Sequence, residues 1–166
     1  AVAAVYGSAT AVEAVKANET ASATLAGATS AVMGKAVAVL AGLNPDSYAD
    51  MAAVAASQTA MAAVAASSTA LSAIAASTTA LDALYAKKKR MSGASASLSG
   101  KFIILQISND NAFDTSRYGY ATLSDGSKPK WDSYKDKYAY FKQYKKIATY
   151  MKNDTDSNDW IDYFQC

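Results

Sequence analysis

The sequence predicts an α+β protein in which an Ala-rich, coiled-coil-like oligomeric helical shaft precedes a small, β-rich C-terminal head. Residues 51–80 repeat one ten-residue phrase of Ala, Ser and Thr, with large apolar residues at fixed places. The composition changes near residue 90, and 14 of the 17 aromatic residues lie beyond residue 100. We therefore expect four segments: helical repeats over 1–43, a decad-repeat shaft over 44–90, a Ser/Gly linker over 91–100 and a Tyr-rich head over 101–166.

The composition excludes several classes of protein. The 166 residues include no His, and the one Cys is Cys166, so neither an intrachain disulfide framework nor a cysteine-based zinc cluster can form. Lys and Arg number 16 against 14 Asp and Glu, which gives no electrostatic reason to expect nucleic acid as a partner. No strongly apolar run is long enough to span a bilayer, so we expect no membrane insertion. The first residues lack Met and lie inside a repeat, which indicates a fragment of a longer chain.

The N-terminal segment belongs to the same repeat. Residues 1–20 fit the ten-residue frame, which weakens over 21–40. Gly42 is typical of a helix end. Asn44 followed by Pro45 predicts a new N-cap with Pro at the first helical position.

The decad favours a helix because Ala is the best helix former and a poor strand former. Its large residues, such as Met61, Val64 and Leu71, recur three and then seven residues apart. Ten residues fall about 80° short of three turns, so the apolar stripe winds around a straight helix, and two or three intertwined helices could bury it. We expect a trimeric stalk about 60 Å long over 45–86. Its oligomer core would be Met51, Val54, Met61, Val64, Leu71, Ile74, Leu81 and Leu84.

Other structures for the decads remain open. A helix on the surface of its own domain would show the same periodicity. A β-solenoid could place one decad in each rung, although Ala argues against strands, and regular Met, Val, Leu and Ile argue against disorder. The three residues added to each heptad could overwind a continuous helix or break it, and the sequence leaves both possible.

The head is expected to combine several strands with one helix. Apolar runs and alternation predict strands, and Asp-Gly and Pro predict a turn. The Tyr-rich stretch 131–152 fits both periods. The expected elements are strands at 101–108 and 117–124, a turn at 124–130, a strand near 138–141, a helix over 142–151 and a closing strand at 159–166.

The aromatic residues of the head outnumber those that so small a core can hold. Exposed Tyr and Trp give rigid binding area with a polar group, which suits sugars or protein loops. The candidate receptor-binding residues are Tyr118, Tyr120, Trp131, Tyr134 and Trp160.

Weaker motifs yield no catalytic residue, metal ligand or cofactor site. The run "DTDSND" at 154–159 has calcium-loop spacing but lacks the required Gly and Glu, so a polar turn is the simpler interpretation. "KKKR" at 87–90 could bind phosphate, or simply suit the negative end of a helix dipole. Asp132 and Asp136 could pair as acid and base, but the interleaved Lys residues are more typical of a solvated face.

The repeat over 51–80, the joint "SGASASLSG" and the strand "GKFIILQIS" resemble tail-fibre and receptor-binding proteins of tailed bacteriophages. That resemblance implies an elongated homotrimer, located extracellularly in the virion tail, whose tip binds a bacterial surface glycan or protein. We therefore expect a structural and adhesive protein that is not an enzyme. A fibre-associated polysaccharide-degrading enzyme and a purely structural filament or joining protein are the alternatives.

Overall fold

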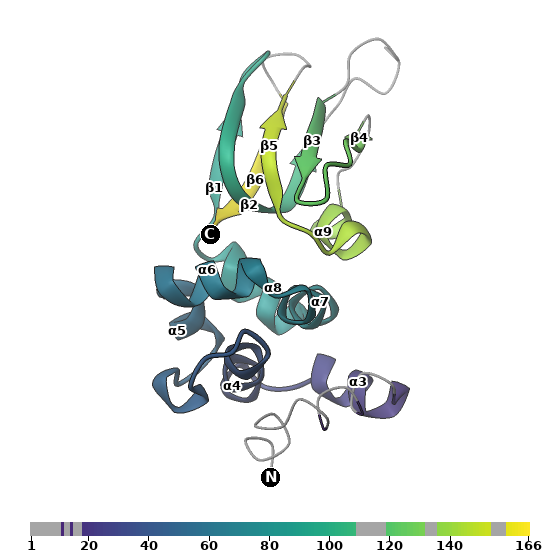
Figure 1. The fold of residues 1–166 in the computed structure, drawn as a ribbon. Helices are drawn as coiled ribbons and strands as arrows, with labels where there is room; N and C mark the ends of the chain where they lie inside the picture. Colours follow the sequence, from purple (N-terminus) through teal and green to yellow (C-terminus); the bar gives the residue numbers. More distant parts are fainter. Residues whose placement is uncertain (1–10, 12–13, 15–17, 109–118, 132–135, 154–158) are drawn as a thin grey trace. The chain divides into compact units, whose positions relative to one another are not determined.

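The computed structural model describes residues 11, 14, 18–108, 119–131, 136–153 and 159–166. The chain divides into two units, 1–86 and 87–166, and each is described by itself (Figure 1). The first unit is helical, and the second is built on an antiparallel sheet.

In the described part of the first unit, six short α-helices and one 3₁₀ helix follow one another. They are α3 (Glu19–Ala26), α4 (Ser30–Leu40), η1 (Pro45–Ser47), α5 (Met51–Ala56), α6 (Gln58–Ala66), α7 (Ser68–Ala76) and α8 (Thr78–Tyr85). Helix α4 contacts all four of the decad helices α5 to α8, and α8 returns to contact α5. The decads therefore form a ring of short helices packed against α4.

The predicted coiled-coil shaft is wrong, because the repeat breaks once in every decad. Ser57, Ser67 and Ser77 adopt extended backbone conformations between consecutive helices. Each N–H donates to the carbonyl three residues earlier, at 3.0–3.1 Å, and so closes the preceding helix. Each Oγ accepts from the backbone N–H three residues later, at 3.2–3.3 Å, and so caps the next helix. Helices α6 and α7 consequently meet at 102°.

The break explains how large apolar residues spaced ten apart can all be buried on one side. A Ser side chain satisfies the backbone groups that a bend exposes, so the chain can turn at little cost. Each turn restores the apolar residues to the same side, whereas on a straight helix they would drift. All eight residues expected in an oligomer core are instead at most 4% exposed within the single chain. They are Met51, Val54, Met61, Val64, Leu71, Ile74, Leu81 and Leu84.

Two helix boundaries predicted upstream of the ring are confirmed, a helix end at Gly42 and an N-cap at Asn44. Helix α4 stops before Gly42, whose φ of +75° suits a residue without a side chain. Leu43 N–H donates to the Ala38 carbonyl at 2.8 Å and closes the helix end. Asn44 then caps η1 by accepting from the Asp46 N–H at 3.0 Å, with Pro45 at the first position.

Two serines and one glycine fix α4 against the ring. The Ser30 Oγ accepts from the Met51 N–H at 3.3 Å, at the start of α5. The Ser67 Oγ donates to the Leu40 carbonyl at 2.7 Å, at the corner between α6 and α7. Gly34 lies so close to the start of α5 that a Cβ would stand 2.2 Å from the carbonyl carbon of Asp50. Helix α4 is therefore hydrogen-bonded to the ring at both of its ends, through Ser30 at the first and Leu40 at the last.

The second unit contains a six-stranded antiparallel sheet in the order β1-β6-β2-β5-β3-β4, with one described helix, α9 (Figure 1). The strands are β1 (Lys89–Ser92), β2 (Ser97–Ser108), β3 (Gly119–Leu123), β4 (Lys130–Trp131), β5 (Ala148–Lys152) and β6 (Trp160–Gln165), and α9 covers Ala139–Tyr144. The segment 91–100, expected to be a linker, instead holds the end of β1 and the start of β2.

The strand predicted at 101–108 is confirmed as part of β2. Within the described residues, the strands predicted at 117–124 and 159–166 are confirmed as β3 and β6, over 119–123 and 160–165. The order predicted over 138–151 is wrong, since the helix comes first and the strand second. Left-handed residues bound the helix, with φ of 67° at Tyr138 and 53° at Lys145. Strand β5 then pairs with β2 on one side and β3 on the other, and this pairing outweighs the helical spacing of the local sequence.

One apolar cluster of the second unit lies on one face of its sheet. Tyr140 and Tyr144 of α9 pack there with Phe102, Ile104 and Met151. The Trp131 ring meets Tyr140 edge-on, at 5.5 Å between centroids. Helix α9 also buries Phe141, which is 1% exposed.

Candidate functional site

Where β2, β5, β3 and β4 lie side by side, the opposite face of the sheet carries two rows of polar and aromatic side chains, which we call the Tyr–Lys face. Residues directly opposite one another in antiparallel strands project from the same side, so the register defines both rows. The first row is Ser97, Lys152, Tyr120 and Lys130, and the second is Ser99, Tyr150 and Thr122. The rows cross β2, β5 and β3, and the first continues onto β4.

The residues between these rows show that the Tyr–Lys face points away from the core. Leu98, Met151 and Ala121 are also aligned across β2, β5 and β3. All three belong to the apolar core. Since side chains alternate along a strand, the residues on either side of them project from the other face.

The two tyrosines form the centre of the Tyr–Lys face. The rings of Tyr120 and Tyr150 lie 5.7 Å apart between centroids, inclined by 38°. Both side chains are half-exposed, and Ser97, Ser99 and Lys130 are exposed. Tyr120 stands between Lys152 and Lys130 in the register of its two neighbouring strands. Lys152 and Lys130 are the two charged residues of these rows.

The five aromatic residues predicted to bind a receptor do not share one place. Tyr120 lies on the Tyr–Lys face. Trp131 is only 1% exposed and belongs to the core, so it cannot contact a receptor. Trp160 is half-exposed on β6. Tyr118 and Tyr134 lie outside the described residues.

Sequence reasoning missed Tyr150 because its segment was expected to be helical. The stretch "YMK" alternates an outward Tyr150, a buried Met151 and an outward Lys152. Read as a strand, this alternation places Tyr150 and Lys152 together on the polar side. The signal was present, but the helical spacing of the neighbouring tyrosines concealed it.

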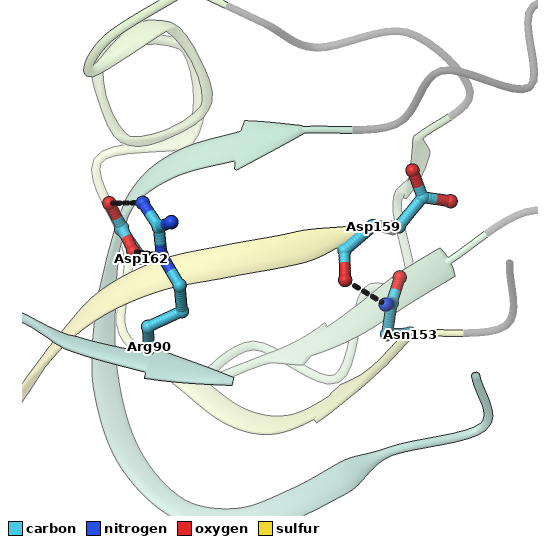
Figure 2. Close-up of polar contacts among 4 residues, drawn as sticks. All are labelled: Arg90, Asn153, Asp159 and Asp162. Atoms are coloured by element: carbon cyan, nitrogen blue, oxygen red, sulfur yellow. Dashed lines mark hydrogen bonds and ion pairs between the residues drawn. The ribbon is translucent and has the colours of Figure 1, made fainter. Parts of the chain in front are cut away.

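Trp160 takes part in a separate arrangement that joins the edge strand β1 to β6. The Arg90 guanidinium makes two hydrogen bonds to the Asp162 carboxylate, at 2.6 and 2.9 Å (Figure 2). It also lies 3.7 Å from the centroid of the Trp160 ring. The Asp162 side chain is fully buried. Arg90, the last residue of the basic run 87–90, therefore has a structural role in which bidentate pairing and ring stacking act together.

Asn153 directly precedes the calcium-type motif 154–159, and Asp159 is the last residue of that motif. The Asn153 Nδ2 donates to the Asp159 backbone carbonyl at 3.1 Å (Figure 2) and to the Gly93 carbonyl at 3.3 Å. Both Asn153 and Asp159 are buried. The rest of the motif, 154–158, lies outside the described residues. Within the described ranges, no three Asp, Glu or Cys side chains gather as a metal site.

Two titratable groups of the second unit have strongly shifted pKa values, for structural reasons. Hydrogen bonds from Lys146 and Ser127 hold the pKa of the Asp125 carboxyl well below its usual range. Burial raises the pKa of the Cys166 thiol to about 12, against a smaller opposing effect of Lys101. Asp125 is therefore a poor proton acceptor at neutral pH, and Cys166 is a poor nucleophile. Of the proposed acid–base pair, Asp132 lies outside the described residues.

Comparison with protein-family models, curated proteins and solved structures found no match for this chain. In the part of the chain that the structure describes, no single helix has the length and apolarity to cross a membrane. Helices α6 and α7 meet those criteria only when taken together as a bent pair.

Proposed function

We propose that this chain is an adhesive component of a bacteriophage tail and that its Tyr–Lys face contacts a receptor on the bacterial surface. The observation that carries the proposal is the half-exposed pair of Tyr120 and Tyr150, on the side of the sheet away from the apolar cluster that contains Met151. A tyrosine offers a rigid apolar ring and a polar hydroxyl, which suits a binding surface.

The resemblance of the repeat, of the Ser/Gly-rich joint and of strand 100–108 to tail-fibre proteins supports the same proposal. The rod-like shaft is no longer part of it, because the decads fold into a ring. Homotrimer formation and location in the virion tail remain predictions. A trimer would need a surface other than the eight buried residues of the ring. Light scattering at micromolar concentration tests it, and a monomer would contradict it.

The experiment measures binding of the fluorescently labelled chain to a panel of bacterial strains by flow cytometry. The double variant Tyr120→Ala/Tyr150→Ala is compared with Tyr48→Ala, which alters a half-exposed tyrosine of the helical unit. We expect at least tenfold weaker binding for the double variant only, because truncating aromatic residues at an interface commonly costs over 1 kcal/mol each. Circular dichroism checks that both variants are folded.

Three results would contradict the proposal. Equal binding by the double variant and the unaltered chain would remove the Tyr–Lys face as the contact surface. Release of reducing sugars from the bacterial polysaccharide would indicate the enzyme alternative. Absence of binding to every strain would favour the purely structural alternative.

A further inference from the structure

We infer that Asp125 and Gly126 form a site of spontaneous isoaspartate formation, and that the folded second unit suppresses this reaction through Lys146 and Ser127. Asp125 and Gly126 are exposed in the turn 123–127. An Asp followed by Gly is prone to the reaction, because Gly has no side chain that would obstruct attack by its own backbone nitrogen. The inference concerns the chemical lifetime of the chain and is independent of the proposed function.

The reaction proceeds in two balanced steps. First, the Gly126 nitrogen attacks the carbon of the Asp125 carboxyl group, and a C–N bond forms while a C–O bond breaks. The carboxyl OH and the amide proton leave together as water, and a succinimide ring remains. Second, water adds to one of the two ring carbonyls and breaks its C–N bond, which yields either Asp or isoaspartate. The first step therefore needs a free amide and a protonated carboxyl group, since a carboxylate cannot lose oxide.

The turn engages the amide that has to attack. The Gly126 N–H donates to the Leu123 carbonyl at 2.9 Å, and the Leu123 N–H donates to the Ser127 carbonyl at 2.9 Å. Gly126 has a φ of +83°, and a left-handed Gly at this place is typical of a three-residue hairpin loop. The nitrogen can attack only after its bond to Leu123 breaks, so the turn raises the barrier of the first step.

Ser127 and Lys146 engage the carboxyl group at both of its oxygens. The Ser127 N–H and Oγ donate to Oδ1 of Asp125, at 3.1 and 2.6 Å. The Lys146 ammonium donates to Oδ2. These bonds stabilise the charged form, and they hold the pKa of the Asp125 carboxyl well below its usual range. Asp125 must therefore leave both partners and take up a proton before it can lose an oxygen.

The contact with Lys146 depends on the fold. Lys146 lies 21 residues beyond Asp125, just before β5. The neighbouring Ile147 carbonyl accepts from the Ser124 N–H at 2.8 Å, which fixes the turn beside the start of that strand. Suppression is thus a property of the sheet, whereas the Asp–Gly sequence alone favours the reaction.

Isoaspartate would disturb the pairing of β3 with β4. It carries the chain through the side-chain carboxyl group and so adds one carbon atom to the backbone of the turn. The hairpin from β3 to β4 pairs Tyr120 with Lys130, and this register depends on the length of the loop. Protection of Asp125 therefore preserves the Tyr–Lys face.

The experiment follows isoaspartate in the full chain during several weeks at neutral pH. Trypsin releases the peptide 118–130, because it cleaves after Arg117 and Lys130 but not between Lys128 and Pro129. Chromatography against synthetic standards and labelling by isoaspartyl methyltransferase then measure isoaspartate. The free peptide 118–130 is incubated in parallel as the unfolded reference. Each net hydrogen bond corresponds to a factor of about five, so we expect the folded chain to react at least about tenfold more slowly than the peptide.

Matched variants test the two side chains. An exposed ion pair is worth a factor of up to about five, so Lys146→Gln should react about two to five times faster than the unaltered chain. Lys146→Gln/Ser127→Ala should react faster still. The control Lys145→Gln/Ser124→Ala alters the neighbouring lysine and serine and should leave the rate unchanged, because the contacts of Asp125 remain. Tryptophan fluorescence checks that each variant is folded.

Four results would overturn the inference. Absence of isoaspartate from the free peptide would remove the site, and equal rates in the peptide and the folded chain would remove its suppression. Lys146→Gln no faster than the control would exclude the ion pair as the cause. An equal acceleration in Arg90→Ala, which weakens the opposite edge of the sheet, would show that opening of the whole unit sets the rate.

Discussion

Replacing Ser67 with Ala tests whether the decads break at their serines. The Ser67 Oγ caps α7 by accepting from the Ala70 N–H at 3.2 Å, and it donates to the Leu40 carbonyl at 2.7 Å. Loss of an N-cap costs about 1 kcal/mol, and an unpaired carbonyl in a partly buried site costs about 1 kcal/mol more. We expect Ser67→Ala to lower the free energy of unfolding by about 2 kcal/mol.

The sign of this change separates the ring from a continuous helix. Ser is a weaker helix former than Ala, so in a continuous helix the same substitution would stabilise the protein by up to about 0.5 kcal/mol. The matched control is Ser57→Ala, which removes the cap on Ala60 but no hydrogen bond to α4, and should cost about 1 kcal/mol.

The assay is urea unfolding followed by far-ultraviolet circular dichroism, which reports on the helices. Tryptophan fluorescence follows the other unit separately, because Trp131 and Trp160 both lie in 87–166. Ser57, Ser67 and Ser77, where consecutive decad helices meet, are the serine corners of the ring. A Ser67→Ala variant at least as stable as the unaltered protein would refute the capping role of these corners. Equal losses in Ser67→Ala and Ser57→Ala would refute the contribution of the Leu40 contact.

Three further substitutions or treatments have defined outcomes. Gly34→Ala should lower the free energy of unfolding by about 1–3 kcal/mol, because its Cβ would stand 2.2 Å from backbone, whereas at Gly27 the nearest atom is 3.8 Å away. Arg90→Ala should cost about 3 kcal/mol, and more than Asp162→Asn, because it leaves the buried carboxylate without its guanidinium. Alkylation of Cys166 at pH 8 should be about a thousandfold slower in the folded protein than in urea. The unfolded thiol ionises first, so stability should fall between about pH 9 and 12.

The measurements for these predictions are urea unfolding for the variants and mass spectrometry of the alkylated chain for Cys166. Equal stabilities of Gly34→Ala and Gly27→Ala would contradict the close approach of α4 to α5. If Asp162→Asn lowered the free energy of unfolding more than Arg90→Ala did, the unpaired buried carboxylate would not be the dominant cost of losing the ion pair. Rapid alkylation of the folded protein would contradict the raised thiol pKa.

The apolar pattern of the decads was readable from the sequence, but the path of the chain was not. Large residues such as Met61 and Val64 mark the buried side whether the helix bends or continues. A serine can bond within a continuous helix or cap a new one. The choice depends on α4, which offers the Leu40 carbonyl and an apolar surface to the ring. Such contacts between distant segments have no local signal.

The candidate site was predictable where the strands alternate clearly. Tyr120 falls between the buried Gly119 and Ala121, so its outward position follows from the strand period. Tyr150 was missed because the tyrosines before it also fit a helical period, and only pairing with β2 and β3 decides in favour of a strand. Trp131 could not be assigned from a two-residue strand, since its burial comes from Tyr140 on α9.

The serine corners make ten residues the unit in which this chain can change length. A tandem duplication of one decad would add one complete helix with its own cap, and every later apolar residue would keep its inward orientation. A duplication of seven residues would move the next serine away from its corner and turn the following large residues toward water. Because three corners already bring α8 back beside α5, an added decad would begin a second layer. We therefore expect an insertion of ten residues to disturb the ring less than an insertion of any other short length.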